Sequence, residues 1–264
     1  MAKAAYNRDM TESVVEPRRR RRSRRGRVTV VGVLGEILMT GGVVVLLFLG
    51  WQLWFNNVIS TNEQATVADD LSHEWASAAP TASADPVQNG DPGTPVVTST
   101  PDAGTAFANL IVPRLGADFK RPIAQGIGKA VLDNTKLGMG HYPDTQLPGE
   151  PGNFALASHR SAYGGAFHNI HQLVVGDSIW VETADGWYKY IYRSMEYVQA
   201  SGVGVILPVP QSPGTAATQS IITLTTCNPF YSSAERIIAY GVFDSWYPRA
   251  DGPPAEIATI ATVS

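Results

Sequence analysis

The sequence predicts a mainly β domain that follows a single membrane-spanning helix, and two observations predict it. Residues 37–55 are a run of 19 residues without a charged side chain, which at about 1.5 Å per helical residue matches the roughly 30 Å hydrocarbon core of a bilayer. From residue 106 onward, short runs of apolar, β-branched and aromatic residues alternate with turn-forming residues, a pattern typical of strands. With 44% hydrophobic and 16% charged residues, the composition excludes a wholly disordered or collagen-like chain.

The segment before the apolar run, residues 1–36, is a basic tail. Eight of the ten residues in 18–27 are arginines, and residues 1–55 carry ten basic and four acidic side chains, against ten and nineteen in the rest of the chain. Alone, the arginine run would fit a nucleic-acid patch. Before an apolar span, the positive-inside rule instead predicts a cytoplasmic tail and an exported remainder.

The two edges of the span have side chains that suit a membrane interface. We expect Glu36 at the inner edge, because a carboxylate is costly at mid-bilayer. The outer edge would carry an aromatic belt of Trp51, Trp54 and Phe55. A cleaved signal peptide is the alternative, but no small-residue cleavage site follows the span directly.

Residues 56–105 are predicted to form a flexible stalk. Residues 56–75 are polar and could extend the membrane helix. Residues 76–105 are rich in Ala, Pro, Ser, Thr, Asp and Gly, a composition that cannot bury a core. The remaining residues, 106–264, number about 160 and suffice for one well-buried domain.

Seven runs within this domain have strand character. They are Phe107–Pro113, Asn153–Ala157, Ser178–Glu182, Trp187–Val198, Val203–Leu207, Ser220–Cys227 and Arg236–Phe243. Ala184-Asp185-Gly186 predicts a hairpin turn between the third and fourth runs. Helical candidates are short, at 129–136 and 166–173. Many strands and few helices predict a β-barrel or a β-sandwich, and periodicity alone leaves both open.

Cys227 is the only cysteine of the chain, which excludes an intrachain disulfide framework and any CxxC site. A lone cysteine is often simply a buried core residue. Here it ends a predicted strand, directly before Asn228-Pro229, in a domain predicted to be exported, where an unpaired thiol is open to oxidation. Because a strand end on the rim of a sheet can meet a substrate, Cys227 is a candidate nucleophile.

A cysteine nucleophile needs a base or a cation nearby, because only the thiolate attacks. His159 ends another apolar strand and could meet Cys227 at one rim. Arg236 opens the strand after the Cys227 loop, so across an antiparallel pair it would face the cysteine and could stabilise an oxyanion. An ordinary exposed arginine, paired with Glu235, is the other interpretation.

These residues together resemble the sortases, the cysteine transpeptidases of bacterial cell surfaces. The sortase hallmark TLxTC stands here as residues 223–227, TLTTC, with His159 upstream at a strand end and Arg236 one loop downstream. Class E, common in actinobacteria, is the most similar class. Its characteristic segments stand here as Gly140-His141-Tyr142-Pro143, Pro148-Gly149-Glu150-Pro151-Gly152-Asn153 and His159-Arg160. Two positions depart or vary: Ser158, where members often have Gly, and Asn228.

The resemblance implies a closed eight-stranded sortase-type β-barrel with short helices, preceded by one transmembrane helix. It implies that the Cys227 thiolate attacks the Thr carbonyl of a C-terminal LAxTG- or LPxTG-type sorting signal. His159 would protonate the departing Gly amine, and Arg236 would stabilise the oxyanion. The implied substrate-binding residues are Tyr142, Thr225 and Thr226. Tyr142 is the candidate for a preference for Ala over Pro, although a tyrosine that only packs on the barrel fits the same position.

The resemblance also implies partners and a location. The partners are secreted proteins with C-terminal sorting signals and an amine of lipid II or peptidoglycan, to which the surface protein becomes attached. The location is the cell membrane, single-pass, with a cytoplasmic N-terminus and an extracytoplasmic catalytic domain. No metal or cofactor is implied.

Three alternatives stay open from the sequence. The same fold could polymerise pilins through a lysine acceptor, or could hydrolyse its substrate. The domain could be a non-catalytic anchored binding module. A metal-dependent exported hydrolase could be built on His159, His168 and His171, although the last two also fit an exposed helix flank.

Overall fold

The computed structural model describes residues 29–51, 55–78 and 94–261. The chain divides into two compact units, Met1–Leu47 and Phe48–Ser264. The second unit carries every candidate site residue, so the fold is described mainly there.

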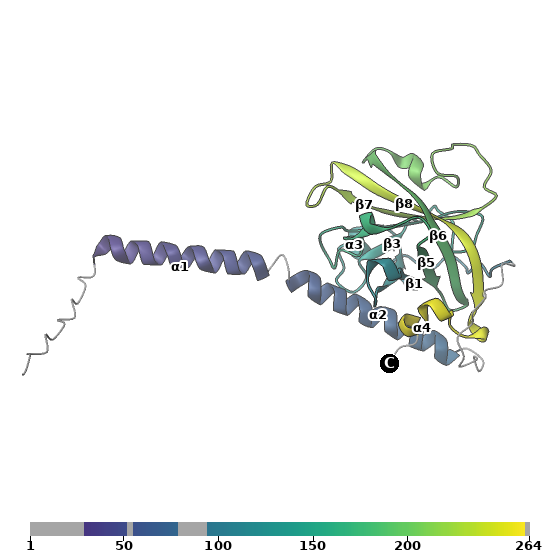
Figure 1. The fold of residues 1–264 in the computed structure, drawn as a ribbon, viewed down its shortest axis with the longest axis horizontal. Coiled ribbons are helices and arrows are strands. Elements are labelled where there is room, and N and C mark those ends of the chain that lie inside the picture. Colours follow the sequence, from purple (N-terminus) through teal and green to yellow (C-terminus); the bar gives the residue numbers. More distant parts are fainter. Residues whose placement is uncertain (1–28, 52–54, 79–93, 262–264) are drawn as a thin grey trace, which may run out of the picture. The chain divides into compact units, whose positions relative to one another are not determined.

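Helix α1 (Val30–Gly50) accounts for the described part of the first unit and reaches into the second. All of its side chains are exposed, and among the described residues it is the one helix long and apolar enough to cross a membrane (Figure 1). It begins seven residues before the predicted span at 37–55, so Glu36 lies inside the helix rather than at its edge. The arginine run at 18–27 and Trp54 lie outside the described residues.

Eight strands of the second unit close into a barrel (Figure 1). They are β1 (Ala106–Ile111), β2 (Lys120–Gln125), β3 (Met139–His141), β4 (Gly152–Ser158), β5 (Ser178–Glu182), β6 (Gly186–Gln199), β7 (Ser220–Asn228) and β8 (Glu235–Pro248). Around the ring the order is β1-β2-β3-β4-β7-β8-β6-β5. The pairs β2–β3 and β4–β7 are parallel, and the others are antiparallel. The eight-stranded barrel implied by the resemblance is confirmed.

The helices of this unit are short apart from α2 (Asn56–Ala78). The others are η2 (Pro113–Leu115), α3 (Lys129–Leu132), η3 (Ile170–Gln172), η4 (Val203–Ile206), η5 (Arg249–Asp251), η6 (Ala255–Ile257) and α4 (Ala258–Ala261). The helices predicted at 129–136 and 166–173 are therefore present as α3 and η3, each shorter than expected.

Three strand predictions differ from the structure, each for a local reason. β2 was not predicted because it contains Pro122, which lacks a backbone donor and is unusual inside a sheet. β3 was not predicted because it has three residues. The predicted strand at 203–207 is the 3₁₀ helix η4; Val203 is 70% exposed, and a short apolar run does not by itself distinguish a strand from a helical turn.

The barrel interior is a closely packed apolar core. Along β7 the side chains alternate between the two faces of the sheet, and Ile222 and Leu224 lie fully buried in the main core cluster. Thr223, Thr225 and Cys227 alternate with them and share the opposite face of the strand. The position of Cys227 is therefore set by the same alternation that buries its apolar neighbours.

Helix α2 packs against β1 and β2, which differs from the flexible stalk expected over 56–105. Its buried residues recur every fourth position and are small or polar: Ser60, Gln64, Ala68 and Ser72. After α2, residues 94–105 also touch the barrel, since the Tyr188 hydroxyl donates to the carbonyl of Val96 at 2.5 Å. The part of the predicted stalk at 79–93 lies outside the described residues.

A buried carboxylate, Glu182, joins α2 to the barrel. It accepts hydrogen bonds from the Ser72 hydroxyl at 2.7 Å, from Asn109 Nδ2 at 3.1 Å and from Arg249 Nη2 at 2.9 Å. A fully buried carboxylate needs such partners to be tolerated. The four side chains come from α2, β1, β5 and η5, so this cluster holds four separate parts of the chain together.

His141, the last residue of β3, is buried in neutral surroundings. One ring nitrogen lies 2.7 Å from Gln125 Oε1, and the other lies 3.0 Å from Thr145 Oγ1 and from the carbonyl of Gln146. Burial lowers the pKa of His141 to about 4, against a smaller opposing effect of the Gln146 carbonyl. The imidazole is therefore neutral near pH 7.

The low pKa of His141 predicts that the folded protein loses stability in mild acid. Because the pKa of His141 is lower in the folded than in the unfolded chain, its contribution is complete above about pH 6.5 and is lost as the pH falls toward 4. The loss is on the order of 3 kcal/mol. Urea unfolding of Phe48–Ser264 between pH 7 and pH 4 measures it. His141→Gln should flatten this part of the profile, whereas His171→Gln, at an exposed position, should leave it unchanged; equal slopes in both variants would contradict the assignment.

Candidate active site

Cys227 and Arg236 are paired directly across the antiparallel strands β7 and β8. Residues opposite each other in such a pair point to the same face. Both side chains are half-buried, so each packs partly against its neighbours and remains partly accessible to solvent. The expectation that Arg236 faces Cys227 across the loop is confirmed.

His159 reaches the same end of the barrel through the parallel pairing of β4 with β7. The ladder runs through Ala157 opposite Thr225. His159 directly follows β4, and it lies two residues beyond this last ladder pair, as Cys227 does on β7. Both strands point the same way, so their carboxyl ends meet at one edge of the sheet.

Two of the three threonines of the TLTTC motif, Thr225 and Thr226, hold this register. Thr225 Oγ1 donates to the carbonyl of Leu156 at 2.9 Å, and Thr226 Oγ1 donates to the carbonyl of Ser158 at 2.7 Å. Both threonines are buried. The hydroxyls therefore fasten β7 to β4 next to the site, while contact of Thr225 and Thr226 with a substrate stays a prediction.

His159 makes a hydrogen bond with a carboxylate that the sequence did not predict. Its Nε2 lies 2.8 Å from Oδ1 of Asp133, and the two side chains are 31% and 32% exposed. Asp133 is the C-cap residue directly after α3. The ring of Tyr163 lies 5.4 Å from the imidazole. Asp133 is 26 residues from His159 and stands in no motif, so nothing in the sequence marked it.

Arg236 is held by its own loop. Its Nη1 donates to the carbonyls of Ser233 and Glu235, both at 2.9 Å. An arginine has five N–H donors in a planar arrangement. Both bonds use Nη1, which leaves Nε and Nη2 to donate to an oxygen of a bound ligand.

Tyr142 joins the site from the segment after β3. Its hydroxyl lies 3.2 Å from Thr225 Oγ1. Since the Thr225 hydroxyl gives its proton to Leu156, the Tyr142 hydroxyl donates to Thr225. The phenol oxygen then keeps lone pairs that can accept a hydrogen bond from a ligand. Tyr142 thus lies on the Cys227 face of β7, two residues before the cysteine.

The other histidines do not gather around His159. His168 is exposed, and its ring packs on Phe230 with centroids 4.6 Å apart. His171 is exposed in η3. Nowhere in the described ranges do three His, Cys, Asp or Glu side chains converge as metal ligands would. These side chains therefore do not form the three-histidine site.

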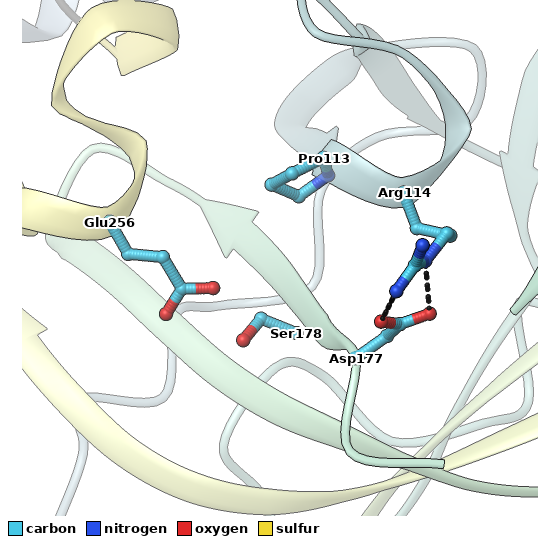
Figure 2. A pocket seen from close by; sticks show the side chains of 5 residues that line it. All are labelled: Pro113, Arg114, Asp177, Ser178 and Glu256. Atoms are coloured by element: carbon cyan, nitrogen blue, oxygen red, sulfur yellow. Dashed lines mark hydrogen bonds and ion pairs between the residues drawn. The ribbon is translucent and has the colours of Figure 1, made fainter. Parts of the chain in front are cut away.

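A separate pocket of about 270 Å³ opens between η2, the start of β5 and η6. Figure 2 shows its lining residues, Pro113, Arg114, Asp177, Ser178 and Glu256. Arg114 donates to both carboxylate oxygens of Asp177 at 2.8 Å. Its cation is thus already neutralised, and none of the candidate catalytic residues lines the pocket.

Comparison with known proteins shows the family to which this chain belongs. Residues 110–244 match the model of the sortase domain. Over 253 residues the chain is 38% identical to sortase SrtE1 of Streptomyces coelicolor, covering 92% of this chain and 66% of that protein, slightly less than two thirds of its length. Over 230 residues it is 34% identical to sortase SrtE2 of the same organism, covering 85% of this chain and 86% of that protein.

Solved structures give the same assignment. The SrtA sortase from Actinomyces oris superposes with a TM-score of 0.62 at 35% identity, covering 67% of this chain and all of that one. Sortase E1 from Streptomyces coelicolor, solved with a tripeptide in its active site, gives 0.52 at 38% identity, covering 58% and 97%. The chain therefore belongs to the sortase family, and its class E relatives confirm the class that its motifs predicted.

Proposed function

We propose that this protein is a cysteine transpeptidase that cleaves LAxTG- or LPxTG-type sorting signals between Thr and Gly and transfers the Thr carbonyl to an amine. One observation carries the proposal: Cys227 and Arg236 face each other across β7 and β8, and His159 directly follows the parallel strand β4 at the same end of the barrel. A nucleophile, a proton carrier and a cation thus come from three neighbouring strands and their ends.

The reaction has two balanced steps. The Cys227 thiolate attacks the Thr carbonyl, the bond to the Gly nitrogen breaks, and imidazolium His159 gives its proton to the departing amine. An acceptor amine then attacks the thioester, His159 takes its proton, and the thiolate is released. Arg236 donates to the oxyanion in each step through the groups that its loop leaves free.

Asp133 orients the histidine in this scheme. Because Nε2 is bound to the carboxylate at 2.8 Å, Nδ1 is the ring nitrogen that exchanges protons with the substrate. The carboxylate also stabilises the imidazolium form, as an orienting acid does in other nucleophile–histidine sites.

The apolar helix α1 supports a location of this reaction at a membrane. Helix α1 serves as a single-pass anchor, with the arginine-rich tail cytoplasmic and the barrel outside the cell. Sorting-signal proteins and lipid II are themselves membrane-bound, so anchoring raises the effective concentration of all reactants. The product is a surface protein attached to peptidoglycan precursor.

The central test uses Phe48–Ser264 as wild type and Cys227→Ala. Each is mixed with LAxTG and LPxTG peptides, with and without an amine of the oligoglycine, diaminopimelate or lysine type, and products are identified by mass spectrometry. A Thr-acyl adduct on Cys227 and an amine-ligated peptide are expected for wild type alone. Ligation of lysine only would favour pilin polymerisation, hydrolysis only would favour a hydrolase, and an unreactive folded protein would contradict the proposal.

Asp133→Asn should lower kcat by on the order of tenfold and leave KM nearly unchanged, because the neutral amide neither fixes the ring nor stabilises imidazolium. Peptide-cleavage assays that are quenched at fixed times, with either peptide as substrate, measure kcat and KM. Asp251→Asn, at an exposed position in η5, is the matched control. An equal effect of the two substitutions would remove Asp133 from the mechanism.

Tyr142→Phe should lower kcat/KM for LAxTG by about fivefold, equivalent to about 1 kcal/mol for one hydrogen bond, and should leave LPxTG almost unaffected. We expect the free lone pairs of the Tyr142 hydroxyl to accept from the Ala N–H of the signal, a donor that Pro lacks. Competition between the two peptides reports the ratio directly. Tyr197→Phe, 57% exposed on β6, is the control, and an unchanged Ala/Pro ratio in Tyr142→Phe would refute the assignment.

A further inference from the structure

Each of the three proposed catalytic residues has a sequence neighbour that takes part in one hydrogen-bonded chain. Arg160 follows His159, Asn228 follows Cys227, and Glu235 precedes Arg236. We propose that Arg160, Asn228 and Glu235 form a brace that fixes the spacing of the catalytic residues, an inference that rests on the proposed function. In this chain they are positioning residues and do not touch the reacting atoms.

The brace is continuous from one strand end to the other. Arg160 Nη1 donates to Asn228 Oδ1, and Asn228 Nδ2 donates to Glu235 Oε2 at 3.1 Å. Asn228 therefore uses both ends of its amide, which fixes the amide orientation. Because Asn228 and Glu235 are also directly paired across β7 and β8, the side-chain bond repeats the backbone pairing one step beyond Cys227 and Arg236.

The cation of the brace is fixed in place by burial. Arg160 is 7% exposed, and its guanidinium carbon lies 4.1 Å from the centre of the Phe230 ring. A buried guanidinium is stable only with such partners, because it has left water. Arg160 thus has little freedom to follow a shift of the loop after Cys227.

The brace and the catalytic side chains lie on opposite faces of β7 and β8. Neighbours along a strand point to opposite sides, and paired residues point to the same side. Cys227 and Arg236 therefore share one face, and Asn228 and Glu235 share the other, which along β7 is the face that carries Leu224 into the core. The brace can hold the catalytic residues without occupying the face of β7 and β8 that Cys227 and Arg236 share.

The backbone needs this help at the end of β4. The β4–β7 ladder ends with Ala157 opposite Thr225, and His159 lies beyond the last residue of β4. Side-chain bonds continue the connection on both sides of the histidine: Thr226 to the carbonyl of Ser158 before it, and Arg160 to Asn228 after it. They replace the missing ladder where His159 must meet Cys227.

The test uses the full-length protein in detergent and exchanges the hydrogen-bond donor and acceptor between positions 228 and 235. Asn228→Asp removes the donor to Glu235 and places two carboxylates together, so kcat should fall by about 10- to 100-fold, the scale of a small misplacement of reacting groups. Glu235→Gln still accepts from Asn228 and should stay within about threefold of wild type. The double variant restores both the bonds and the net charge, so kcat should recover to within about threefold of wild type.

Two further measurements separate the brace from other roles. Arg160→Gln should lower kcat as Asn228→Asp does, while Arg193→Gln, exposed on β6, should not. The rate at which iodoacetamide alkylates Cys227 should rank the variants in the same order as kcat does. The reaction is specific because the chain has one cysteine. Thermal unfolding serves as the control that every variant is folded. No rescue in the double variant, or a change in KM alone, would overturn the brace.

The alkylation rates do not depend on peptide turnover. If wild type cleaves neither peptide and the alkylation order still holds, the brace stands and the proposed function fails. If wild type cleaves and all variants behave alike, the function stands and the brace fails.

Discussion

The candidate active site at one end of this barrel depends on the parallel pairing of β4 with β7. Because side chains alternate along a strand, a slip of one residue in this pairing would shift the end of β4, and His159 after it, relative to Cys227. Parallel strands also need a long crossover, so nothing local fixes this register. The hydroxyls of Thr225 and Thr226, bonded to β4 carbonyls at 2.9 and 2.7 Å, provide the fixation, which gives the TLTTC motif a structural reason beside its cysteine.

The sequence predicts the candidate site residues that lie at strand ends. It does not predict contacts that depend on how separate elements pack together. Cys227 and Arg236 follow from one hairpin, whose pairing is local and readable from turn and strand patterns. The approach of Asp133 to His159 depends on how α3 lies beside the end of β4, and no residue pattern encodes that distance. β2 was missed for the same kind of reason, since Pro122 argues locally against a strand that the closed barrel nonetheless pairs.

Helix α2 shows why a polar segment was mistaken for a stalk. Sequence reasoning looks for an apolar stripe on a helix, but this interface is made of small and polar residues that bond to the barrel. Gln64 Nε2 donates to the carbonyl of Tyr163 at 2.8 Å, and a side chain at Gly138 would clash with Gln64, its Cβ lying 2.2 Å from Nε2. Since the Tyr163 ring lies beside His159, α2 supports the loop that follows the histidine.

The two positions noted as departing from or varying within the class pattern have specific partners in the structure. Ser158 stands where family members often have Gly, and its hydroxyl donates to the carbonyl of Gly138 at 2.7 Å, tying the end of β4 to the start of β3. Asn228 stands at a variable position and bonds to both Arg160 and Glu235. Both side chains lie at the last residue of a strand, next to His159 and Cys227. Side-chain hydrogen bonds thus add to the backbone pairing at the ends of β4 and β7, where the candidate catalytic residues lie.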